Sequence, residues 1–307
     1  MTASSPETPR RGWRPVGPLA QGQWAILAIL ALLTVGAWAL TVAMARSMNM
    51  PMGIAARGGA AGGMDGMASG GAMSGMTGMS GASDMAMSGA AAGGWSIAAV
   101  AWFLAAWTVM MAAMMFPAAA PMLVMFHRLS AQRRAQGAPF VSTWVFVAGY
   151  LLVWAAAGVV VYWLIQLASD AATRLGAGDR ATWAPIALGA TLIVAGVYQL
   201  TPLKRMCLGH CRSPLSFVMT HWREGRFGAL RMGVAHGLYC LGCCWALFAV
   251  LVAAGVMSLA WMLLLTLVVF LEKVAPQGQR AAAAVGGAFI LLGILVAAGA
   301  AAMPWMA

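Results

Sequence analysis

The sequence is poor in charge. Only 8% of its 307 residues are charged and seven are acidic, whereas 62% are hydrophobic. A soluble domain carries about 25% charged residues, so the composition predicts an all-α polytopic membrane helical bundle. The net charge of +11 does not indicate a nucleic-acid partner, because Lys and Arg collect in the cytoplasmic loops of membrane proteins. The expected partner is the lipid bilayer, with no nucleic acid.

The lack of a nucleotide-binding motif and the odd number of cysteines exclude two classes of protein. The chain has no Gly-rich phosphate-binding loop, so any energy from ATP would have to come from a partner protein. Its five cysteines are an odd number, which excludes a complete set of disulfides. Their position beside apolar helices is also unlike a secreted disulfide framework.

About seven apolar segments could cross a bilayer core of about 30 Å. They cover residues 24–45, 95–125, 141–168, 183–203, 232–257, 259–271 and 281–303. The first follows a basic tail, residues 1–23, and exceeds the ~7–15 apolar residues of a signal-peptide core, so we expect a retained anchor. Pro117 and Pro121 should kink or end the second segment. Glu272 and Lys273 close the sixth, where snorkelling to the interface is the simplest interpretation.

Basic residues predict the orientation. With the N-terminus inside, cytoplasmic segments hold all but four of the 18 lysines and arginines. They include basic loops at residues 127–134 and 204–231. The four on the opposite side are Arg46, Arg57, Arg174 and Arg180. This asymmetry predicts an N-in, C-out multi-pass protein.

Residues 46–94 differ from the six-helix domain expected at 95–303. They consist largely of Gly, Ala, Ser and Met, cannot bury a core, and should be disordered. The methionines are Met48, Met50, Met52, Met64, Met67, Met73, Met76, Met79, Met85 and Met87. Thioethers suit Cu(I), so we favour a copper-capturing tether over a plain flexible linker. In the next segment, Met110 and Met114 share one helical face, as do Met111 and Met115. This methionine ladder could relay a soft cation or simply pack.

All five cysteines and three of the four histidines lie within residues 207–244. The predicted metal ligands among them are Cys207, His210, Cys211, His236, Cys240, Cys243 and Cys244. On a helix, the last three lie within about 100° of arc with His236. Thiolate and imidazole are ligands that soft or borderline metals prefer. Lys204, Arg205 and Arg212 could stabilise thiolates nearby.

Two alternatives to a metal site stay open. Buried thiols can act as small hydrophobes, and Cys240 and Cys243 could form a redox pair. The spacing is not that of a zinc finger. If the segment around Cys207 folds back over the start of the 232–257 segment, the two blocks could form one Cys/His cage.

The chain resembles a family of uncharacterised bacterial integral membrane proteins described as predicted metal-binding. The resemblance covers about residues 95–303 and rests on YQLTPLKRMCLGHCRSPL, WREG, GALRMGVAHGLYCLGCCWAL and EKVAP. It implies a location in the bacterial inner membrane and a metal-related role for the Cys/His blocks. The Met-rich segment looks like those of copper-resistance proteins in composition.

The leading hypothesis is a membrane protein that binds copper, as Cu(I), and moves or delivers it across or within the membrane. A copper donor or acceptor protein, or a larger membrane complex, would be its partner. One alternative is a thiol–disulfide oxidoreductase that uses Cys240 and Cys243. Another is an assembly factor of a membrane complex with a structural zinc site.

Overall fold

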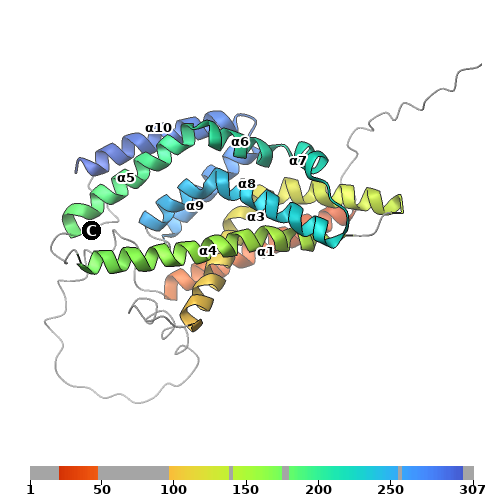
Figure 1. Ribbon diagram of the computed structural model, residues 1–307, viewed down its shortest axis with the longest axis horizontal. Coiled ribbons are helices and arrows are strands. Elements are labelled where there is room, and N and C mark those ends of the chain that lie inside the picture. Colours follow the sequence, from red (N-terminus) through yellow and green to blue (C-terminus); the bar gives the residue numbers. More distant parts are fainter. Residues whose placement is uncertain (1–20, 48–96, 138–140, 175–179, 255–257, 300–307) are drawn as a thin grey trace, which may run out of the picture.

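The computed structural model describes residues 21–47, 97–137, 141–174, 180–254 and 258–299. The regular elements in these ranges are all helices (Figure 1), which confirms the all-α prediction. They are α1 (Gln21–Ser47), α3 (Ile97–Ala135), α4 (Thr143–Arg174), α5 (Arg180–Leu200), α6 (Pro202–Arg212), α7 (Pro214–His221), α8 (Gly225–Ala254), α9 (Leu259–Val274) and α10 (Gly278–Ala297).

Six helices of the described chain are long and apolar enough to cross a membrane: α1, α3, α4, α5, α8 and α10. The expected segment 259–271 corresponds to α9, which has 16 residues. At 1.5 Å per residue, α9 is about 24 Å long and falls short of a ~30 Å hydrocarbon core. The membrane helical bundle is therefore confirmed with six full-length candidate spans and a shorter apolar α9. The N-in, C-out orientation requires a seventh crossing by α9 and stays a prediction.

The two proline residues do not end α3. The helix continues through Pro117 and Pro121 for 39 residues, and Figure 1 shows it changing direction between its gold and yellow parts. A proline removes one backbone donor and bends a helix without necessarily stopping it when neighbouring helices pack against the bend. The basic stretch 127–134, expected as a loop, is the last part of this helix.

The basic segment 204–231 is also not a loop, since it forms α6, α7 and the start of α8. Thr201 caps α6 by accepting a hydrogen bond from the Lys204 backbone N–H at 3.3 Å, and Pro202 begins the helix. Pro214 begins α7 in the same way. Proline at the first position of a helix costs no hydrogen bond, because that N–H has no partner within the helix. The first cysteine block therefore lies on a capped helix.

Close helix packing sets the framework around this block. Figure 1 shows α5 and α10 side by side, and a methyl group on Gly196 would lie 2.6 Å from the Gly286 carbonyl oxygen. On the other side, Gly233 of α8 lies directly against the Phe146 carbonyl of α4, and Gly237 packs against Val153. Small residues let membrane helices approach backbone to backbone. The α4–α8 contact brings Tyr150 to the cysteines of α8.

Candidate metal centre

The two cysteine blocks meet where α6 packs against α8. Cys211 Sγ lies 4.0 Å from Cys243 Sγ, and Cys243 Sγ lies 3.3 Å from Cys244 Sγ. Cys207 rests on the α8 backbone, where a methyl group on Gly242 would come within 3.0 Å of its sulfur. All five cysteines are buried and free of disulfides. The fold thus gathers thiols from two helices into one sulfur cluster, defined as Cys207, Cys211, Cys240, Cys243 and Cys244.

The histidines do not join this cluster. His236 is buried among aromatic rings, with centroid distances of 5.9 Å to Phe146, 5.8 Å to Tyr150 and 5.4 Å to Phe217. His210 stacks on Tyr239 with centroids 4.2 Å apart, and its Nδ1 lies 2.9 Å from the Met206 carbonyl oxygen. Across the described ranges, no three Cys, His, Asp or Glu side chains converge on one point suited to an ion. In the described residues the sulfur atoms therefore meet in close pairs, Cys211 with Cys243 and Cys243 with Cys244, and not as a preformed three-cysteine site or a mixed Cys/His cage.

Cys240 has a neighbourhood of its own inside the bundle. Lys273 of α9 donates a hydrogen bond from Nζ to Cys240 Sγ at 2.9 Å. The hydroxyl of Tyr150 lies 3.1 Å from the same sulfur, and Met115 Sδ of α3 lies 4.0 Å from it. The Lys273 ammonium is also 4.0 Å from Met115 Sδ. Four helices therefore bring a thiol, a thioether, a phenol and a cation together.

Two of the three cations that flank the first cysteine block, Lys204 and Arg212, bind Glu272, whereas Arg205 is exposed. Lys204 Nζ pairs with Glu272 Oε2 at 2.6 Å, and both side chains are only 1% exposed. Gln199 Nε2 donates to Glu272 Oε1 at 3.0 Å, and Arg212 Nη1 donates to the Glu272 carbonyl oxygen at 2.6 Å. We call Gln199, Lys204, Arg212 and Glu272 the ionic clamp.

The ionic clamp corrects two expectations. Glu272 and Lys273 do not snorkel, because both are buried against partners on neighbouring helices. Lys204 and Arg212 do not face the thiols, since the carboxylate and the main-chain carbonyl of Glu272 hold them. The clamp ties α6, which carries Cys207 and Cys211, to α9, which carries Lys273. The clamp thereby fixes the position of these two cysteines relative to Lys273.

The methionine segments have different fates. Met110, Met111, Met114 and Met115 of α3 are all buried, and among them Met115 reaches a cysteine sulfur. The proposed tether, with Met64, Met67, Met73, Met76 and Met79, lies outside the described residues.

Two residues at this centre, Tyr150 and Lys273, were not predicted to take part in metal chemistry, and Met115 was predicted only as part of the methionine ladder of the second segment. A signal for Lys273 existed, because an ionisable residue next to a long apolar segment is a functional candidate by default. Tyr150 carried no such signal, since its role depends on how α4 packs against α8.

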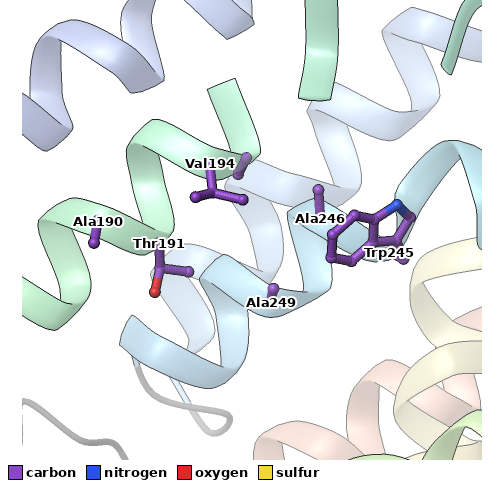
Figure 2. Close-up of a pocket in the computed structure, with 7 residues that line it drawn as sticks. Ala190, Thr191, Val194, Trp245, Ala246 and Ala249 are labelled. Carbon is purple, nitrogen blue, oxygen red and sulfur yellow. The ribbon is translucent and has the colours of Figure 1, made fainter. Parts of the chain in front are cut away.

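A shallow cavity of about 220 Å³ lies between α5 and α8, away from this chemistry (Figure 2). Its walls are alanines with Val194, Trp245 and Thr191. The Thr191 hydroxyl already donates to the Ala187 carbonyl at 2.8 Å. The cavity thus offers neither a charged group nor a sulfur.

Sulfur spacing at the cluster suits a soft ion. With metal–sulfur bonds of about 2.3 Å, two sulfurs on one ion lie about 3.8 Å apart in a tetrahedral arrangement and about 4.6 Å apart in a linear one. The 4.0 Å separations, Cys211 to Cys243 and Cys240 to Met115, fall in this range, whereas Cys243 and Cys244 at 3.3 Å are closer together than two ligands of one ion. Burial raises the pKa of the Cys207 thiol, so metal binding there would have to displace a proton.

Comparison with known protein families identifies one match. A family model described as PpoB2, copper chaperone, matches residues 104–296. This range contains every cysteine of the chain and extends from α3 to the end of α10. No curated protein and no solved structure matched the chain. The match supports a copper-related function, in agreement with the soft donors at the centre of the bundle. Because it spans more than half of the sequence, the chain belongs to the PpoB2 copper chaperone family.

Proposed function

We propose that this protein binds Cu(I) at the sulfur cluster and delivers it to an acceptor within or across the bacterial inner membrane. The observation that carries the proposal is the close approach of free, buried cysteines across the contact of α6 with α8, where Cys211 Sγ lies 4.0 Å from Cys243 Sγ. Thiolate and thioether donors select Cu(I) over harder ions. Family membership supports copper as the cargo.

The arrangement also suits release. Cu(I) needs only two or three soft ligands, and the cluster with Met115 offers more than that within short reach of one another. An ion could therefore exchange one sulfur for the next without becoming fully uncoordinated. In this proposal, the Met-rich segment 46–94 collects copper outside, and the methionines of α3 pass it inward.

Metal content per chain tests the proposal. We would load detergent-purified protein with Cu(I) or Zn(II) under reducing conditions and compare wild type with Cys240→Ser/Cys243→Ser and a deletion of residues 48–87. We expect copper to fall in both variants. The matched control is Ser130→Ala, a buried position outside the cluster, which should keep its copper. Zinc binding alone, unaffected by the deletion, would contradict the proposal and favour a structural zinc site.

One observation favours a second candidate, a thiol–disulfide oxidoreductase. The Lys273 ammonium donates to Cys240 Sγ at 2.9 Å, and a neighbouring cation promotes the thiolate form that attacks disulfides. Cys243, however, directs its thiol to the Cys240 carbonyl oxygen at 3.2 Å. Trapping separates the two functions: in Cys243→Ser, a mixed disulfide through Cys240 would support the oxidoreductase.

A further inference from the structure

Lys273 is the most unusual charged group in the bundle. Its side chain is buried, with 8% of the residue exposed, and the partners it has in the structure are the sulfurs of Cys240 and Met115. Burying an ammonium is costly unless a partner compensates the charge. The adjacent Glu272 carboxylate is committed to Lys204 and Gln199. A purely structural lysine would be expected to share that carboxylate.

The Lys273 ammonium lies beside two sulfur atoms of the kinds that Cu(I) prefers as ligands, a cysteine sulfur and a thioether. Its nitrogen lies 2.9 Å from a thiol sulfur and 4.0 Å from a thioether sulfur, and these two sulfurs are 4.0 Å apart. Ammonium and Cu(I) carry the same single positive charge. The pair of sulfurs therefore already holds a monovalent cation when no metal is bound.

We propose that the Lys273 ammonium is a resident cation at a Cu(I) position formed by Cys240 and Met115, and that arriving Cu(I) displaces it. This inference rests on the proposed function and names the position and the residue that regulates it. The displaced side chain has a short way to go. Lys273 is one residue from the end of α9 at Val274, and a lysine's four-carbon stem can carry its charge to a polar surface.

The exchange gives the position selectivity. When Cu(I) enters and the ammonium leaves, one positive charge replaces another beside the Cys240 sulfur. Cys240 is a thiolate in both states, paired first with the ammonium and then with Cu(I), so the exchange moves no proton. A divalent ion would leave one positive charge uncompensated in an interior that offers one thiolate and one neutral thioether. In the metal-free protein the Lys273 ammonium balances the charge of the Cys240 sulfur, so that sulfur always has a cation beside it. Lys273 thus competes with the metal rather than binding it.

Amine labelling of the full-length wild-type protein tests this directly. Lys204 is the chain's other lysine, and the ionic clamp buries it, so it is a built-in control. We would treat metal-free and Cu(I)-loaded protein with a small amine-reactive reagent and quantify each lysine by mass spectrometry. We expect Cu(I) to increase Lys273 labelling at least about fivefold, because displacement moves its amine from a buried position toward a polar surface that the reagent can reach. Labelling of Lys204 should be unchanged.

A second experiment measures the competition. In Lys273→Leu, Cu(I) affinity, determined against a chromogenic Cu(I) chelator, should rise at least about tenfold, the scale of like-charge repulsion between close neighbours. Lys273→Arg keeps the charge and should not show the gain. In a Cys240→Ser background, the gain from Lys273→Leu should disappear.

The outcomes separate the two proposals. If wild type binds no Cu(I), both the function and this inference fail. If wild type binds Cu(I) but Lys273 labelling does not increase, only the displacement is overturned. A weaker or unchanged affinity in folded Lys273→Leu would also overturn it and make Lys273 a structural or thiolate-stabilising residue. Should Lys273→Leu not fold, the labelling of wild type still decides.

Discussion

The two lysines of this protein lie on neighbouring parts of the bundle and are compensated in different ways. Lys204 pairs with the Glu272 carboxylate at 2.6 Å within the ionic clamp. Lys273, the next residue after Glu272, faces the sulfurs of Cys240 and Met115 instead. A buried charge with a carboxylate partner holds helices together. A buried charge against soft donors marks a place where a different cation can bind.

The largest expected effect comes from breaking the ionic clamp. Glu272→Gln would leave Lys204 buried without its counter-ion, which should destabilise the protein by about 3–5 kcal/mol. The matched control is Glu224→Gln, which removes the exposed Arg133–Glu224 pair and should cost about 0–1 kcal/mol. Thermal unfolding in detergent measures both. Equal melting temperatures in the two variants would show that the clamp does not stabilise the fold.

A smaller effect should distinguish the methionines around the sulfur-facing lysine. Met115→Leu removes the thioether near Cys240 and should weaken Cu(I) binding about tenfold, or roughly 1.4 kcal/mol. Met262→Leu alters an equally buried methionine of α9 that has no part in the proposed copper route, and it should leave the affinity unchanged. Both substitutions conserve volume and should cost less than about 1.5 kcal/mol of stability. Similar losses of affinity in the two variants would mean that Met115 has no special role.

The smallest expected effect is a shift in the pH at which the Cys207 thiol reacts with an alkylating reagent. Because burial raises the pKa of the Cys207 thiol, it should stay protonated at a pH where an ordinary cysteine, with a pKa of about 8.5, is already ionised. In a variant with the other four cysteines changed to Ser, iodoacetamide should react with folded protein at a higher midpoint pH than with protein unfolded in SDS. Identical midpoints would contradict this.

The same raised pKa has a consequence for stability. The unfolded chain loses its Cys207 proton first as pH rises, so the folded state binds more protons above the ordinary thiol pKa. The contribution of Cys207 to the free energy of unfolding is therefore full below the unfolded-state pKa. It declines as the pH rises from there toward the higher pKa of the folded state.

Much of the fold could be read from the sequence, because long apolar runs determine where helices cross a bilayer. The helical nature of residues 202–221 was missed, although Thr201-Pro202 and Ser213-Pro214 are typical helix starts. High local charge suggested a loop there. In the structure, the ionic clamp neutralises part of that charge and lets α6 pack against α8.

The sequence predicts which cysteines belong to the candidate site, but it does not predict which side chains surround them. Clustering in sequence pointed to thiols on α6 and α8, and the packing of these two helices brings them together. Helical periodicity placed His236 on the same face as Cys240, but aromatic residues from α4 and α7 enclose its ring. Which neighbour a side chain meets depends on tertiary packing, which a single helix's periodicity does not encode.

The most direct test of the central claim is X-ray absorption at the copper edge of full-length protein loaded with one equivalent of Cu(I). We predict two or three sulfur neighbours, with bonds near the ~2.3 Å of metal thiolates, and a clear change in this shell in Cys240→Ser/Cys243→Ser. A shell of nitrogen or oxygen, or a spectrum that is the same in wild type and variant, would contradict copper binding at the buried cysteines.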